Sequence, residues 1–101
     1  MTPFPVRRVS PTELRQMFND GHFWERVQQG TLRCVVQKSR HCRVPPVGEP
    51  LCTHSQIACY YDQDDEEVAR VHQYRRPDGT IGASGRPDPK RLLVNGTVFI
   101  V

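Results

Sequence analysis

The residues best suited to chemistry lie between positions 68 and 90, where a strand-like run leads into a loop rich in glycine, proline and arginine. Backbone amides beside glycines can approach a partner closely because glycine has no Cβ, and an anion needs only such amides and nearby cations. The loop is therefore predicted to bind an anionic partner. Its predicted contact residues are Arg75, Arg76, Gly82, Gly85, Arg86, Lys90 and Arg91.

The same loop also has an ordinary structural explanation. Its glycines would serve tight turns, as Gly79 does after Pro77 and Asp78, and its arginines would keep the surface soluble. The sequence matches neither the GxGxxG dinucleotide pattern nor a phosphate-binding loop that ends in Gly-Lys-Ser/Thr. The loop alone therefore indicates no particular anion.

Catalysis is a second hypothesis for the same region. RNA cleavage by transesterification needs a general base, a general acid and groups that hold the phosphate. His72, Tyr74 and Arg75 supply those residue types, with His22 or His54 as a second acid or base. Because the sequence does not place two such groups together, a small metal-independent ribonuclease of toxin type stays the alternative to binding.

A serine or cysteine nucleophile would need a histidine beside it and a group that orients the histidine. The sequence offers Cys52 with His54, and Ser84 with His72. Neither pair lies in a nucleophile elbow or a cysteine-protease signature, so no covalent mechanism is predicted.

Potential zinc ligands gather within nineteen positions, from His41 to Cys59. Structural zinc sites usually build each half from a tight Cys-x2-4-Cys turn, whereas the closest pairs here are adjacent or alternate residues. Cys59 also occupies an apparent core position of a strand. We therefore predict no metal cofactor, and the candidates for a zinc site are Cys42, Cys52, His54 and Cys59.

Length and composition favour a single small domain. A chain of 101 residues with 37% hydrophobic content has room for one modest core. No apolar run is long enough to cross a bilayer, and the N-terminus lacks the apolar segment of a secretory signal. We therefore expect a cytoplasmic protein whose four cysteines are thiols or metal ligands rather than two disulfides. The oligomeric state is not predicted.

The net charge of +3 conceals a basic, acidic and basic pattern along the chain. Residues 1–43 hold eight Lys and Arg against three Asp and Glu, residues 44–67 none against six, and residues 68–101 six against two. A fold that joins the two ends would present a cationic face. Nucleic acid, or a protein that handles it, is accordingly the first predicted partner, with an ordinary solvated surface as the alternative.

The N-terminal part reads as an extended arm followed by helices. Pro3 and Pro5 favour extended backbone over residues 1–9. Ser10, with Glu13 three residues later, forms a capping box, and the helix that follows is expected to stop near Gly21. A second short helix is predicted over about residues 22–29.

The remainder reads as strands. Alternation predicts strands at about 31–38, 56–63 and 68–76, with a long Pro-rich loop at 39–55 and an acidic turn between the second and third strands. Asn95-Gly96 between two apolar runs predicts a terminal hairpin. Pro87 and Pro89 argue against a central strand just before it. The predicted fold is α+β, with one or two helices on an antiparallel sheet of about four or five strands.

The segment HQYRRPDGTIGASGRPDPKRLL, with ELRQMFNDGHFWERV upstream, resembles a group of small uncharacterised bacterial proteins. The resemblance covers most of the chain and implies an independent single-domain protein. It implies no activity, cofactor or site residue.

These observations favour a small accessory protein that binds an anionic partner through its Arg/Gly-rich loop. The ribonuclease is the enzymatic alternative. A third hypothesis is a structural or interaction module that presents the loop at 39–55 and the arm at 1–9 to another protein.

Overall fold

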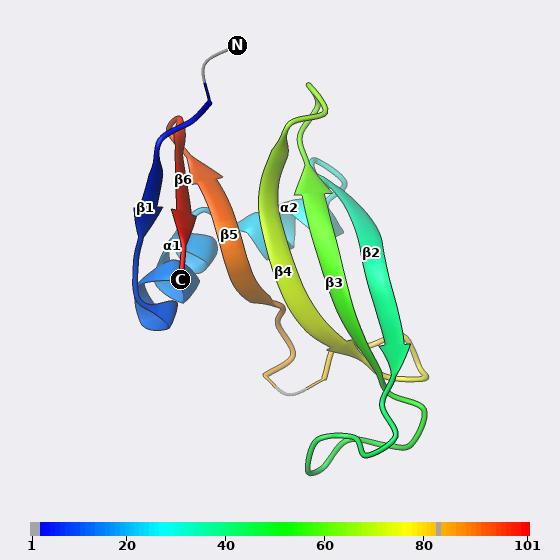
Figure 1. The fold of residues 1–101 in the computed structure, drawn as a ribbon. Helices are drawn as coiled ribbons and strands as arrows, with labels where there is room; N and C mark the ends of the chain where they lie inside the picture. The colour runs from blue at the N-terminus through cyan, green and yellow to red at the C-terminus, as the bar shows by residue number, and fades with distance from the viewer. Residues whose placement is uncertain (1–2, 83) are drawn as a thin grey trace.

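The computed structural model describes residues 3–82 and 84–101 and shows an α+β fold in which two helices lie behind one face of a single sheet (Figure 1). The elements are β1 (Val6–Arg8), α1 (Pro11–Asp20), α2 (Phe23–Gln28), β2 (Arg33–His41), β3 (His54–Tyr61), β4 (Glu67–Arg75), β5 (Asp88–Val94) and β6 (Thr97–Ile100). No helix in this described part of the chain is long and apolar enough to cross a membrane. The predicted α+β class and the two N-terminal helices are confirmed.

The six strands form one mixed sheet in the order β1-β6-β5-β4-β3-β2. From β2 to β6 the chain is an antiparallel meander, as the sequence predicts, but β1 joins the edge parallel to β6. The prediction of about four or five antiparallel strands therefore missed this parallel edge strand.

The segment predicted as an extended arm contains β1. Pro3 and Pro5 lack amide donors, but both precede the strand and leave its hydrogen bonds intact. The Val98 amide donates to the Pro5 carbonyl at 2.8 Å, so the chain is already tied to β6 before β1 begins. The first two residues lie outside the described part.

The helices form where the sequence signals them and bury one side against the sheet. The Ser10 hydroxyl accepts from the Glu13 amide at 3.1 Å and the Glu13 carboxylate accepts from the Ser10 amide at 3.3 Å, which confirms the capping box. Leu14 and Phe18 of α1 and Phe23 of α2 are buried. They pack with residues on the covered face of the sheet, which include Ala58, Tyr60, Ala69, Val71 and Leu92.

The Pro-rich loop is shorter than predicted. It was placed at 39–55 but spans 42–53, because β2 continues to His41 and β3 begins at His54. The Cys42 amide donates to the Thr53 carbonyl at 3.0 Å and closes the base of the loop. Prolines therefore restrict only the tip of this hairpin.

Pro89 contradicts the prediction that it excludes a central strand, since it lies in β5 between β4 and β6. The register of the β4–β5 pair shifts between Arg70 and Val71, next to this residue. A bulge leaves one residue out of the ladder, which accommodates a residue without an amide proton. The predicted turn at Asn95 and Gly96 is confirmed, with φ of 49° and 77°.

The side of the sheet away from the helices is called the open face. On β3 and β4, residues such as Tyr60 and Val71 face the helices, so their neighbours in sequence face the other way. The open face of these two strands carries Ser55, Ile57, Cys59, Tyr61, Glu67, Arg70, His72 and Tyr74. Figure 1 shows no helix in front of it.

Candidate functional site

The Arg/Gly-rich loop uses its glycine amides internally. Gly79 donates to the Arg76 carbonyl at 2.9 Å, Gly82 donates to the Tyr74 carbonyl at 2.7 Å, and Gly85 donates to the Gly82 carbonyl at 3.1 Å. A Cβ at Gly82 would lie only 2.7 Å from the nearest carboxylate oxygen of Glu49, which explains the glycine there. The three amides are therefore committed to the loop's own structure.

Two arginines of the loop are held by carboxylates from distant parts of the chain. Arg76 donates to both Glu49 oxygens at 2.7 and 3.2 Å, and the Glu49 side chain is only 5% exposed. Arg86 donates to Glu25 of α2 at 2.9 and 3.0 Å, and this hydrogen bond lowers the pKa of Glu25. Both pairs fasten the loop to its neighbours, so they explain these arginines without a ligand.

The predicted anion site is divided between two sides of the sheet. Arg75 follows Tyr74 by one position and lines a hollow on the covered side with Cys52, His54 and Arg76. Lys90 and Arg91 belong to β5 and lie beside the open-face residues Arg70 and Glu67. The structure therefore does not bring the predicted contact residues together.

The open face collects the excess positive charge instead. Seven cations lie there, from four strands: Arg8, Arg33, Lys38, Arg40, Arg70, Lys90 and Arg91. The carboxylates on the same face are Glu67 and Asp88. The rest of the chain holds seven Lys and Arg against nine Asp and Glu, so it carries no excess positive charge. The basic character of the protein therefore resides on this one surface.

Some of these cations are engaged and others are not. Arg33 pairs with Asp65 at 3.0 Å and Lys90 pairs with Asp88 at 2.9 Å, while Arg70 and Arg91 share Glu67. Within residues 3–82 and 84–101, Lys38 and Arg40 form no ion pair or side-chain hydrogen bond. These two side chains from β2 are the cations most available to a partner.

Three rings lie among the cations on the open face. Tyr61 stands at one end with the Arg33 guanidinium 5.0 Å from its ring centre. At the other end the rings of His72 and Tyr74 meet edge to face, with centres 4.9 Å apart. Tyr61 lies six positions after Ser55, the residue opposite Tyr74, so the two ends are about 20 Å apart.

A hollow of about 540 Å³ lies between these ends. It is lined by Gln37, Lys38, Ile57, Cys59, Tyr61, Glu67, Arg70 and Lys90. Burial, and the hydrogen bond with Glu67, raise the pKa of the Cys59 thiol, which stays protonated at neutral pH. Cys59 is therefore part of the lining of the hollow and a poor nucleophile.

His72 has a partner that the sequence analysis missed. The Ser55 hydroxyl lies 2.7 Å from its Nε2 atom, across the β3–β4 pair. Burial lowers the pKa of His72, and the charge on Lys90 lowers it further, against the opposing effect of Asp88. Strand alternation together with the register of β3 and β4 places Ser55 and His72 on one face. The sequence does not show that register.

The predicted catalytic and metal sets are separated in the same way. His72 and Tyr74 lie together, but Arg75 points to the other side of the sheet. Cys59 faces the open-face hollow, whereas Cys52 and His54 line the one on the covered side. In the described part of the chain, no three His, Cys, Asp or Glu side chains are grouped as a metal site requires.

The environment of His72 predicts a pH dependence of stability. A folded-state pKa below the unfolded value means that the unfolded chain binds more protons as pH falls below about 6.5. The part of the stability that depends on neutral His72 is therefore fully present above that pH, and it is lost as pH falls through the folded pKa of His72. Thermal unfolding at several pH values should show that acidification lowers the stability of His72→Gln less than that of the native chain. An equal loss in both would contradict this assignment.

Comparison of the chain with protein-family models, curated proteins and solved structures gives no significant match. The resemblance of its 72–93 segment to small bacterial proteins therefore stays a prediction. Any inference about function comes from the geometry of the chain itself.

Proposed function

We propose that this protein binds single-stranded nucleic acid across the open face of its sheet. The observation that carries the proposal is the concentration of seven cations and three rings on the one sheet face that the helices leave uncovered. Phosphate groups supply the negative charge such a face attracts, and unpaired bases supply flat surfaces that stack on aromatic side chains.

The shape of the face favours a single strand over a duplex. Duplex readers place a helix or a two-stranded ribbon into a groove, and an extended sheet surface does not enter one. Bases of a single strand can instead lie flat on a sheet, with rings at Tyr61 and Tyr74 near its two ends. The hollow between them has the volume of a typical small-ligand site, so one nucleotide fits there.

The Arg/Gly-rich loop has a narrower role than the sequence suggests. Lys90 and Arg91 contribute to the open face from β5, while Arg76 and Arg86 hold the loop to Glu49 and Glu25. We therefore still propose binding of an anionic partner, but we assign the contact surface to the sheet rather than to the loop.

Fluorescence anisotropy with a labelled single-stranded RNA, the matching DNA strand and the annealed duplex tests the proposal. We expect the single strands to bind more tightly than the duplex, and the logarithm of affinity to fall by about 0.7 for each phosphate contact per decade of salt. Absence of binding at low salt, or affinity that salt leaves unchanged, would rule the proposal out.

Tyr74→Ala should weaken single-strand binding about tenfold, because one stacked base is lost. Tyr74 is partly exposed and contacts His72 by its edge, so its removal leaves the buried core intact. The matched control is Phe4→Ala, which removes an exposed ring just before β1, the strand at the other edge of the sheet from β2. Equal affinity of the Tyr74 variant and the native chain would show that this ring stacks on no base.

RNA cleavage is the second candidate, and one observation favours it. Burial lowers the pKa of His72, which favours the neutral imidazole that a general base needs, and the Ser55 hydroxyl, 2.7 Å from its Nε2 atom, orients the ring. Incubation of labelled RNA with the native chain and with His72→Ala decides between binding and cleavage. Fragments formed only by the native chain would support an enzyme, whereas intact RNA with both would leave binding alone.

A further inference from the structure

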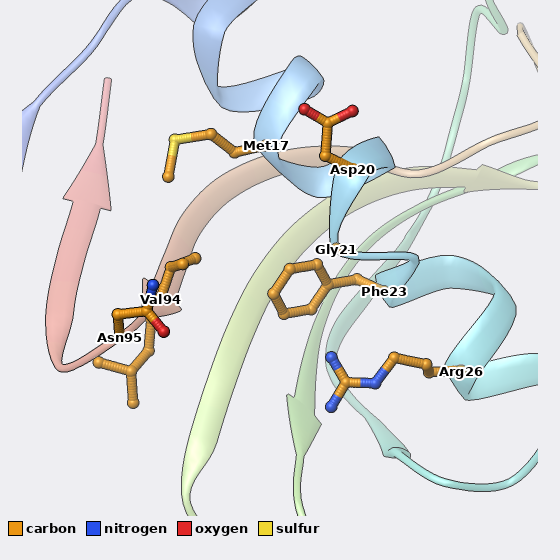
Figure 2. A pocket seen from close by; sticks show the side chains of 8 residues that line it. Met17, Asp20, Gly21, Phe23, Arg26, Val94 and Asn95 are labelled. Carbon is orange, nitrogen blue, oxygen red and sulfur yellow. The ribbon is translucent and has the colours of Figure 1, made fainter.

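A third hollow lies on the helix side of the molecule, between the corner that joins α1 to α2 and the turn that joins β5 to β6 (Figure 2). Its volume is about 430 Å³, within the range of small-molecule sites. The lining residues are Met17, Asp20, Gly21, Phe23, Arg26, Leu93, Val94 and Asn95. It shares no residue with the open face and is independent of the nucleic-acid proposal.

The walls of this hollow are apolar and well fixed. The Phe23 ring stacks on Phe18, with centres 5.7 Å apart and planes 8° from parallel. A Cβ on Gly21 would lie 2.5 Å from that ring, so only glycine lets the ring take this place. Figure 2 shows Met17 and Val94 facing the same space from α1 and β5. A ring or a short branched chain would find apolar contacts on several sides.

One charged group in this hollow is without a carboxylate partner. The Arg26 guanidinium lies 5.3 Å from the centre of the Phe23 ring and forms no ion pair within the described residues. Asp20, the other charged lining residue, accepts a hydrogen bond from Gln16 at 2.8 Å, and Figure 2 shows its carboxylate directed away from the ring. Arg26 is therefore the charged group beside the apolar wall formed by Phe23, while the Asp20 carboxylate is directed away from it.

This contrast identifies the chemistry of a ligand. Arg70, Arg76 and Arg86 each meet a carboxylate of the chain, whereas Arg26 has donors to offer beside an apolar wall. A guanidinium can pair with a carboxylate or a phosphate, but its single charge balances that of one carboxylate and only part of that of a phosphate dianion. Arg26 also lies in the last turn of α2, where a cation favours the helix end, but that role requires no hollow beside it.

We propose that this hollow binds a small apolar carboxylate, with the ring or branched chain against Met17, Phe23 and Val94 and the carboxylate on Arg26. The ligand is a small molecule of about one ring with a short acidic arm. A peptide C-terminus offers the same carboxylate from a larger partner and is separated from it by the test.

The test is a titration of the ¹⁵N-labelled protein followed by amide chemical shifts. The probes are 3-phenylpropanoate, the corresponding alcohol and amine, and N-acetyl-glycyl-phenylalanine. We expect saturable shifts at Gly21, Phe23 and Asn95 with the acid, with a Kd on the order of 1 mM, and weaker or no binding of the alcohol and the amine.

Two variants sharpen the result. Arg26→Gln should weaken binding of the acid about tenfold, because a charge-assisted hydrogen bond is lost. Met17→Trp should fill the hollow and abolish binding, and Val94→Trp replaces it if that variant does not fold. Arg43→Gln, in the loop after β2, removes an equal charge elsewhere and should change nothing.

Several outcomes would overturn the proposal. The amine or the alcohol binding as tightly as the acid would show that Arg26 does not select the ligand. Unchanged affinity in Arg26→Gln, or shifts confined to other residues, would place the acid elsewhere. Binding of the peptide alone would replace the small molecule by a protein terminus. Absence of any saturable shift would mean that the hollow has no carboxylate ligand of this kind.

Discussion

Phe18→Ala should lower the free energy of unfolding by about 3–5 kcal/mol, the usual cost of deleting a buried aromatic ring. Phe18 is 1% exposed and joins the helices to the sheet. Its ring stacks on Phe23 at 5.7 Å and contacts Tyr60 of β3 at 6.2 Å, measured between ring centres. The loss is a large share of the stability of a domain this small, and chemical denaturation of the native chain and the variant measures it.

The matched control is again Phe4→Ala, since Phe4 is 43% exposed and lies before β1. Removal of this ring should change the free energy of unfolding by about 0.5 kcal/mol or less. A loss below about 1 kcal/mol for Phe18→Ala would contradict the description of this residue as the centre of the core.

The elements predicted correctly are those whose signals are local. The Ser10–Glu13 capping box, the apolar spacing of Leu14 and Phe18, and the Asn95-Gly96 turn each depend on a few neighbouring residues. Such signals predict the local structure directly, because the hydrogen bonds and backbone angles involved concern residues that are close in sequence.

The errors concern contacts between distant parts of the chain. β1 pairs with β6 more than ninety residues later, and nothing within the arm indicates that partner. Pro89 enters a central strand only because a bulge falls beside it, and a bulge depends on the register of two strands. Both features follow from the assembled sheet.

The open face could not be predicted from the sequence because it too depends on contacts between distant parts of the chain. Alternation correctly separated Arg70, His72 and Tyr74 from Ala69 and Val71, but it does not tell which set the helices cover. The neighbours of these residues on β2 and β5 follow only from the strand order.

The loop arginines show the opposite difficulty. Arg86 meets a carboxylate sixty-one positions away, and Arg76 meets one twenty-seven positions away. The sequence gives the number of cations near the glycines, but which of them stay unpaired depends on these distant acids. Composition therefore overstated the charge that the loop can offer to a partner.

The double substitution Lys38→Gln/Arg40→Gln should weaken single-strand binding about 25-fold at 0.1 M salt, because each lost phosphate contact changes affinity about fivefold under those conditions. Both side chains stand on β2 and face the open side of the sheet opposite Ile57 and Ser55. Neither forms an ion pair within the described residues, so their replacement leaves no carboxylate of the fold unpaired. The slope of log affinity against log salt should become shallower by about 1.4.

The control variant Arg7→Gln/Arg43→Gln removes the same charge from elsewhere on the molecule, since Arg7 lies over the Phe99 ring on the helix side and Arg43 belongs to the loop after β2. If net charge alone attracts the nucleic acid, both double variants will lose affinity equally and their salt slopes will agree. If the open face holds the strand, only the β2 variant will show the shallower slope. Equal losses of affinity would thus indicate a general attraction between the basic protein and a polyanion. They would contradict the assignment of the nucleic-acid strand to the open face.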